Sequence, residues 1–476
     1  MESKAQSWIL SEKLVGNMKT FITNFSNIGN QPSLRFGVFY REFFDVHDAK
    51  VWDTSVAQLS DFIINISSDK LKKGELDESE YLIDLTNIER RFNSLIDIET
   101  VSDIGSDKNI LGKGDIIIPK IQPRMGNIFT NLEHNRYLAS SELVEYKCIS
   151  NRIHPKILFY LLTHPVFQSA LFATEGGKTH RRVNPSDLLL YKIPIIGVEK
   201  QKSTLSKIID LESQIDNLKS QIIPFNDIID SIFEKHIGIK KNQILDDYKA
   251  FYFCNLNLLL SSDIRSSVRF NNPKYSYLNS SVLTEHTFKD VIDSSKTTLG
   301  RQMSPDFILE DSDVFYVNTN SIKLSGFDDS VLTPISHDFY DKNRKLRVEK
   351  GDILLIASGE GSIGRSCIYD SEIDCVTSQF AMKLHPKSNT DIQFLNYYMH
   401  SFYFQFCIEK FKKGKGNMTN IFVSQVLAFP LYYPSDYIRE SINQEISDSL
   451  LKQSAIKNDI TNLRSEIDGI IDALVQ

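Results

Sequence analysis

Two glycine-containing segments have the residue types of nucleotide-binding loops. Residues 359–364 (GEGSIG) satisfy G-x-G-x-x-G after an apolar run. That fingerprint holds a pyrophosphate at the N-terminus of a helix that opens within the motif. Residues 365–384 are instead rich in β-branched residues and interrupted by Asp and Ser, which predicts strands. We therefore interpret these glycines as a tight turn between strands.

Gly177-Lys178-Thr179 has the ending of a phosphate-binding loop, but position 172 is Phe where that motif needs Gly. The segment also follows a predicted helix and not a strand. Residues 271–275 (NNPKY) are faintly similar to the N/D-P-P-Y/F loop of amino-methyltransferases but lack its second proline. Neither segment predicts a cofactor site.

The remaining chemistry-bearing residues give no metal or nucleophile pattern. Ten histidines include no HExxH motif, and five cysteines, an odd number, include no CxxC pair. This usage predicts reduced thiols, no disulfide and no zinc. Most acidic residues fall on helix faces and turns. A nuclease made of scattered carboxylates and a lysine stays open, because such sites have weak sequence signatures.

Basic loops that recur in both halves are the best candidates for a binding surface. Glycines beside them allow close backbone approach, lysine and arginine can contact phosphates, and arginine can read guanine edges. The alternative is an ordinary solvated loop. The candidate residues are Lys178, Arg181 and Arg182 in the first half, Lys412, Lys413 and Lys415 in the second, and Arg124 and Arg365 in two Gly turns.

These loops belong to a unit that occurs twice. Residues 114–129 (GDIIIPKIQPRMGNIF) and 351–369 (GDILLIASGEGSIGRSCIY) each predict a buried strand, a Gly turn and a second strand. An aromatic-rich helical run follows each of them, at 157–172 and at 394–411. A basic loop comes next, and an apolar segment containing Pro194 or Pro430 closes each copy.

A long helix is predicted after each closing proline. Its apolar residues alternate steps of three and four, which is the pattern of a coiled-coil seam. Two such helices in one chain favour an antiparallel pair. Ser449 and Gln453 are polar seam positions, and Pro224 either kinks the first helix or marks a break between two shorter ones. The apolar seam residues are Ile208, Leu211, Ile215, Leu218 and Ile222, then Ile456, Ile460, Leu463, Ile467 and Ile470.

Composition limits the class of protein. The 476 residues are 41% hydrophobic and 24% charged, with no run approaching the ~20 apolar residues of a membrane span. The N-terminal residues show no secretion signal. We therefore expect a cytoplasmic protein with no membrane partner. The net charge of −7 argues against a uniformly basic surface, so nucleic-acid binding would need local basic residues or a partner that supplies them.

The pattern predicts an α+β protein with two similar globular domains and two long antiparallel coiled-coil helices. We expect the first domain at 1–195 and its helix at 196–238. The second domain is expected at 239–436 and its helix at 437–476.

The order and duplication of these segments resemble the specificity subunits of type I restriction-modification enzymes. The features that carry the resemblance are the paired strand-turn segments, the segments VNPSDLLLYKIPI and FVSQVLAFPLYYP, and the two helices QKSTLSKIIDLESQIDNL and RESINQEISDSLLKQSAIKNDITNL. No single motif is specific, but the arrangement covers nearly the whole chain.

The resemblance implies a non-catalytic subunit that binds double-stranded DNA. Each globular unit would be a target-recognition domain for one half of a bipartite asymmetric site, and the helices would be a spacer that docks two methyltransferase subunits. Restriction/translocase subunits would complete the complex. It implies no cofactor on this chain, with S-adenosylmethionine, ATP and Mg bound by the partners. Two alternatives stay open: a coiled-coil scaffold or adaptor with two protein-binding domains, and a self-contained nuclease or methyltransferase.

Overall fold

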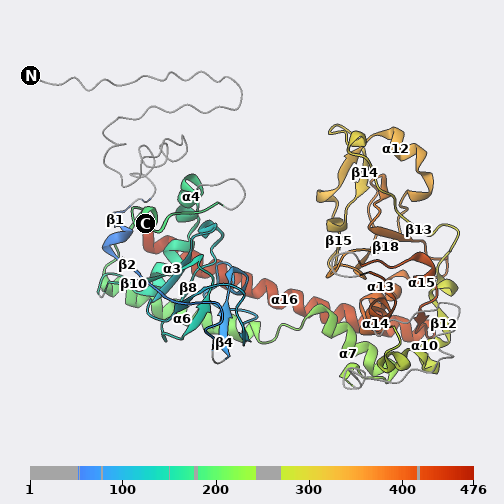
Figure 1. Cartoon of the computed structure of the whole chain (residues 1–476), viewed down its shortest axis with the longest axis horizontal. Helices are drawn as coiled ribbons and strands as arrows, with labels where there is room; N and C mark the ends of the chain where they lie inside the picture. Colours follow the sequence, from blue (N-terminus) through green and yellow to red (C-terminus); the bar gives the residue numbers. More distant parts are fainter. Residues whose placement is uncertain are drawn as a thin grey trace, which may run out of the picture. The chain divides into compact units, whose positions relative to one another are not determined.

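The computed structural model describes residues 52, 54–76, 79–149, 151–175, 181–242, 270–414 and 419–476 (Figure 1). The chain divides into two compact units. Unit 1 comprises Met1–Ser220 together with Asn458–Gln476, and unit 2 comprises Gln221–Lys457. The C-terminal helix α16 (Asp436–Val475) therefore supplies residues to both units.

Unit 1 contains three sheets in its described residues. One is antiparallel with strand order β2-β10-β7-β8, a second has the order β3-β6-β9-β4-β5 with β4 and β9 parallel, and β1 pairs with β11. The strands are β1 (Val56–Gln58), β2 (Ile63–Ile66), β3 (Asp69–Leu71), β4 (Glu80–Ile83), β5 (Glu99–Val101), β6 (Lys108–Leu111), β7 (Ile116–Pro119), β8 (Phe129–Thr130), β9 (Tyr137–Ala139), β10 (Leu143–Cys148) and β11 (Lys192–Pro194).

Unit 2 has a corresponding set of sheets. Strands β13-β21-β18-β19 form an antiparallel sheet, β17-β14-β20 form a second with β14 and β20 parallel, β12 pairs with β22, and β15 pairs with β16. The strands are β12 (His286–Thr287), β13 (Thr298–Leu299), β14 (Val314–Val317), β15 (Ile322–Lys323), β16 (Gly326–Phe327), β17 (Thr333–Ile335), β18 (Ile353–Ile356), β19 (Ser366–Ile368), β20 (Cys375–Thr377), β21 (Ala381–Leu384) and β22 (Pro430–Leu431).

The sheet topology shows that the sequence repeat is a structural repeat. The two four-stranded sheets have the same connectivity, with β7 equivalent to β18 and β10 equivalent to β21. The parallel pairs β4–β9 and β14–β20 occupy the same place in the chain order. The predicted α+β class with two similar globular domains and antiparallel helices is confirmed.

The helices of unit 1 are α3 (Pro155–Thr163), α4 (Pro165–Thr174), α5 (Pro185–Leu188), α6 (Val198–Lys219) and the last part of α16. Those of unit 2 are α7 (Phe225–Ile237), α10 (Ser281–Thr284), α11 (Phe288–Val291), α12 (His337–Lys342), α13 (Ile392–His400), α14 (Phe402–Phe411), α15 (Val423–Leu427) and the first part of α16. Each aromatic-rich run, predicted as one helix, is two helices. Pro165 separates the first pair because it has no N–H to continue the helix, and Ser401 caps the second.

The Gly-Asp pairs that open β7 and β18 have a structural role in both units. In unit 1, Asp115 Oδ2 accepts a hydrogen bond of 2.8 Å from the backbone N–H of Cys148, at the end of β10. In unit 2, Asp352 lies 2.7 Å from Nδ1 of His385, just after β21, and also accepts from the N–H of Glu349. Burial raises the pKa of Asp352, while these contacts oppose that shift. Each aspartate thus joins the start of one strand to the end of its neighbour.

Each unit pairs two helix segments in antiparallel fashion. In unit 1, Lys200 Nζ donates to the carbonyl of Leu474 near the start of α6, whereas Ile215, near its end, shares a pocket with Arg464 of α16. In unit 2, Lys235 of α7 forms a 2.8 Å ion pair with Glu445 of α16. Seam residues Ile208, Leu211, Ile215, Ile460 and Ile467 are buried, and Leu218, Ile222, Ile456, Leu463 and Ile470 are half-buried.

Of the two possibilities for Pro224, the structure shows a break. Helix α6 ends at Lys219, and Pro224 is the N-cap of α7. Gln453 of α16 faces this break: its Oε1 accepts from the N–H of Ile223 at 2.9 Å, and its Nε2 donates to the carbonyl of Gln221 at 3.3 Å. A polar seam residue therefore satisfies backbone groups that the break leaves outside a helix.

His400, at the end of α13, gives unit 2 a pH dependence. Its side chain is buried beside the ring of Phe225, and its Nε2 has no hydrogen-bond partner among the described residues. Burial lowers its pKa from 6.5 to about 4. The folded state therefore binds this proton more weakly than the unfolded state, and stability is lost as pH falls from about 6.5 towards 4.

We expect His400→Gln to remove this part of the acid sensitivity. The shift corresponds to roughly 2 kcal/mol of unfolding free energy lost between pH 7.5 and pH 5 in the parent protein but not in the variant. Urea unfolding at both pH values measures the difference. An identical pH dependence in the two proteins would show that His400 is not held neutral by the fold.

Candidate DNA interface

In unit 1 the Gly turn and the basic loop lie side by side. The N–H of Gln122 donates to the carbonyl of Arg181 at 2.9 Å, and the N–H of Val183 donates to the carbonyl of Lys120 at 2.9 Å. Ile121 and Arg182 form an antiparallel bridge between these segments. Residues about 60 apart in the sequence are thus fixed together by backbone hydrogen bonds.

Unit 2 repeats this arrangement. The N–H of Gly359 donates to the carbonyl of Thr419 at 3.1 Å, and the N–H of Ile421 donates to the carbonyl of Ala357 at 2.9 Å. Ser358 and Asn420 form the matching bridge. We call each assembly a turn–loop surface. It comprises 120–126 with 175 and 181–183 in unit 1, and 357–365 with 412–414 and 419–421 in unit 2.

The glycines of these turns are required by the backbone. Gly126 has φ +77° and Gly364 has φ +91°, a region that other residues rarely adopt. A Cβ on Gly364 would also lie 2.6 Å from Oε1 of Gln405. The segment 359–364 joins β18 to β19, and no helix opens within it. It is the strand-to-strand turn that the sequence predicted.

The unit 1 surface carries three arginines, two of which lie near an exposed aromatic ring. Arg124 Nε forms a 2.7 Å ion pair with Glu175, whose side chain is fully buried. The guanidinium carbons of Arg124 and Arg181 lie 5.0 and 5.3 Å from the ring centroid of Phe172, which is 51% exposed. Arg182 pairs with Glu142 at 3.2 Å. Lys178 lies outside the described residues.

The unit 2 surface has a different distribution of charge. Lys412 forms ion pairs of 3.0 Å with Glu360 and 2.8 Å with Glu409, and its side chain is only 10% exposed. Lys413 is exposed, with its Nζ 5.7 Å from the ring centroid of Phe422. Arg365 is half-buried directly after Gly364. Lys415 lies outside the described residues.

The environment of these ion pairs also affects their titration. Burial raises the pKa of Glu175, and the contacts with Arg124 only partly oppose that effect. Burial lowers the pKa of Lys412, but its hydrogen bonds to Glu409 and Glu360 outweigh burial, so the pKa is raised. Lys412 therefore stays charged and paired within the protein.

The other sequence candidates have structural explanations. Asn272 caps a 3-10 helix over Pro273–Asn279, and Tyr275 of that segment is buried. The described part of the chain contains no group of three or more His, Cys, Asp or Glu residues that could hold a metal. No helix among the described residues is long and apolar enough to cross a membrane. Gly177 and Thr179 lie outside the described residues.

Phe172, Glu175 and Glu360 contribute to these surfaces but are not among the residues predicted from the sequence. Phe172 ends an aromatic-rich run and carried a signal only through its position before a basic loop. The two carboxylates carried no separate signal, because their partners are distant in sequence and the pairing depends on how the turn and the loop pack together.

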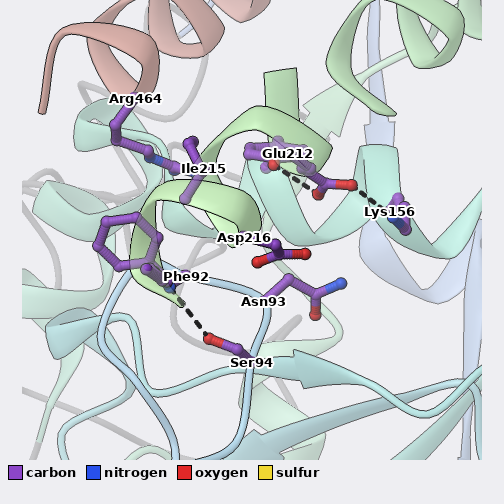
Figure 2. A pocket seen from close by; sticks show the side chains of 10 residues that line it. Phe92, Asn93, Ser94, Lys156, Glu212, Ile215, Asp216 and Arg464 are labelled. Carbon is purple, nitrogen blue, oxygen red and sulfur yellow. Dashed lines mark hydrogen bonds and ion pairs between the residues drawn. The ribbon is translucent and has the colours of Figure 1, made fainter. Parts of the chain in front are cut away.

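A second site that the sequence did not indicate lies in unit 1, between the loop at 92–94 and the helices α3, α6 and α16. Figure 2 shows a small polar pocket in which Phe92 faces the end of α6 and Arg464 of α16. Lys219 Nζ lies 4.0 Å from the Phe92 ring centroid and forms a 2.6 Å ion pair with Glu89. On another wall, Glu212 binds Lys156 and accepts a 2.7 Å hydrogen bond from Tyr160.

Residues 264–467 match the model of the type I restriction modification DNA specificity domain. The chain carries a type I restriction-modification DNA specificity domain. The resemblance drawn from the sequence is thereby confirmed, and unit 1 repeats the strand pairing found within the matched specificity domain. No curated protein matched the chain.

Solved structures of the same kind are similar to this chain at low identity. A chain from a study of complex assembly and conformational transition in the type I R-M system is 13% identical, with 89% of this chain and 97% of that chain covered and a TM-score of 0.43. The type I S subunit from M. genitalium is 12% identical, with 89% of this chain and 96% of that chain covered and a TM-score of 0.40. The HsdS subunit from Thermoanaerobacter tengcongensis is 13% identical, with 91% of this chain and 99% of that chain covered and a TM-score of 0.33.

Phe92 is expected to stabilise the contact between its loop and the end of α6 through both packing and cation–π attraction. Phe92→Ala should lower the free energy of unfolding of unit 1 by about 1–2 kcal/mol, and Phe92→Leu by less, because leucine keeps apolar volume. Urea unfolding of the three proteins at one pH provides the comparison. A leucine variant as stable as the parent would exclude a cation–π contribution.

Proposed function

We propose that this chain is the DNA sequence-recognition subunit of a type I restriction-modification complex. Its two units would read the two parts of a bipartite asymmetric site in double-stranded DNA. The observation that carries this proposal is the turn–loop surface. It occurs in both units with the same backbone pairing but different side chains. Equivalent surfaces with unlike residues suit two different half-sites.

In this proposal the chain performs no chemistry. Two methyltransferase subunits would dock on the helices, and restriction/translocase subunits would complete the complex. S-adenosylmethionine, ATP and Mg would be bound by those partners, in the cytoplasm, where the DNA lies. The paired helix segments support a spacer role, since they continue from both recognition units and α16 supplies residues to each. The partners would also supply part of the phosphate contact that a chain of net charge −7 lacks.

Co-expression with candidate methyltransferase subunits, followed by mapping of N6-methyladenine in the host DNA, tests the proposal. We expect methylation at a two-part motif that is absent when this chain is omitted. A scaffold or adaptor would give no motif with any partner. Methylation or cleavage by the purified chain alone would support a self-contained enzyme.

Arg181 and Arg182 are expected to contact the DNA backbone or bases, since both lie on the unit 1 turn–loop surface and Arg182 is exposed. Changing both to Ala should weaken DNA binding by the assembled complex. It should also make the negative slope of log K against log salt shallower, by about 1 for each phosphate that is no longer neutralised. Binding titrations at several salt concentrations measure this slope, with Arg136→Ala, which removes the partner of Glu80 in the same unit, as control. An unchanged slope would show that these arginines do not neutralise phosphates.

A further inference from the structure

An ion pair occupies the same place on both turn–loop surfaces, but its charges are reversed. Glu175 and Lys412 are equivalent residues. Each directly follows a helix, α4 or α14, and each donates its N–H to the carbonyl four residues earlier, Leu171 or Ile408. In unit 1 the partner on the turn is Arg124, whereas in unit 2 the partner on the turn is Glu360.

The member on the turn is the more exposed one in each unit. In unit 1 the Glu175 side chain is fully buried while Arg124 is 29% exposed. In unit 2 the Lys412 side chain is 10% exposed while Glu360 is 46% exposed. Unit 1 therefore presents a guanidinium group at this position, and unit 2 presents a carboxylate.

Both exposed groups are held in place by further contacts. The Arg124 guanidinium lies over the ring of Phe172, and its Nε donates to Glu175 at 2.7 Å. Glu360 receives a hydrogen bond of 3.0 Å from Lys412 and one of 3.2 Å from the Thr419 hydroxyl. Side chains fixed before binding lose less conformational entropy in the complex.

The two groups have opposite hydrogen-bonding capacity. A guanidinium group only donates, whereas an ionised carboxylate only accepts. In the major groove, arginine suits the O6 and N7 acceptors of guanine, while a carboxylate suits the amino group of cytosine and, as an acceptor, that of adenine. A carboxylate would also be repelled by phosphate, so Glu360 fits a base edge better than the DNA backbone.

We infer that this reversed ion pair sets the kind of base read at equivalent positions of the two half-sites. Arg124 selects a guanine in the half-site of unit 1, and Glu360 selects a base with an exposed amino group in the half-site of unit 2. This inference rests on the proposed function, because it requires that both turn–loop surfaces face DNA.

Arg124→Lys and Glu360→Gln test the inference in the complex assembled with its methyltransferase partners. Lysine keeps the charge but loses the planar fork, and glutamine keeps the size but adds donors. Mapping of N6-methyladenine should show Arg124→Lys relaxing one guanine position in one half-site. Glu360→Gln should move the preference at one position of the other half-site from cytosine towards adenine, because glutamine can donate to N7 of adenine as well as accept from its amino group. Discrimination at the affected position should fall roughly tenfold or more.

Matched controls keep each substitution type but move it elsewhere in the same unit. Arg136→Lys alters an arginine paired with Glu80, and Glu372→Gln alters a carboxylate paired with Lys350. Both should leave the motif unchanged. Phe172→Leu is a second unit 1 variant that keeps the Arg124–Glu175 pair, and it should relax the same position as Arg124→Lys. Thermal unfolding of each variant verifies that the units are intact.

Different experimental outcomes would contradict the inference and the proposed function. A motif that stays unchanged in both variants overturns the inference while leaving the proposed function in place. A uniform fall in methylation with the same motif also overturns it, since that result would place Arg124 on a phosphate. Absence of any two-part motif with the parent chain would instead contradict the proposed function itself.

Discussion

An amphipathic helix must cover its apolar side, and in this chain each unit meets that need with two helix segments distant in sequence. Unit 1 combines α6 with the last part of α16, and unit 2 combines α7 with the first part of α16. Buried residues such as Ile208, Ile446 and Ile467 belong to this packing. Unit 1 is therefore formed from two separate stretches of chain, and truncation at the C-terminus would remove part of it, whereas unit 2 is the continuous stretch Gln221–Lys457.

The polar interruptions of the helix seam are consistent with this packing. A strict coiled coil would disfavour Gln453 on the seam and Pro224 within the helix. The two occur together because α6 and α7 are separate helices, and the amide of Gln453 bonds to the backbone on the N-terminal side of Pro224. Ile471, and not Ile470, is deeply buried after Ile467, so the buried stripe follows the helix with a step of four.

Local patterns in the sequence were sufficient to predict much of this fold. Apolar runs bounded by Gly-Asp and glycine predicted β7 and β18, and heptad spacing predicted the helices. The contact between Gln122 and Arg181 could not be predicted from local patterns, since it depends on how strands and helices pack over about 60 residues. The reversed ion pair was hidden for a further reason. A search for similar residues in two copies cannot match Arg124 with Glu360, although each forms an ion pair with the residue that follows the equivalent helix, Glu175 or Lys412.

The same pairing accounts for an acidic chain with a DNA specificity domain. Arg124, Arg182 and Lys412 each have a carboxylate partner within their own unit, so these surfaces have little net charge from those residues. Weak attraction to phosphate lowers affinity for every sequence equally, whereas a fixed donor or acceptor distinguishes one base edge from another. Such surfaces favour discrimination over tight binding. Under the proposed function, most of the non-specific affinity would come from other subunits of the complex.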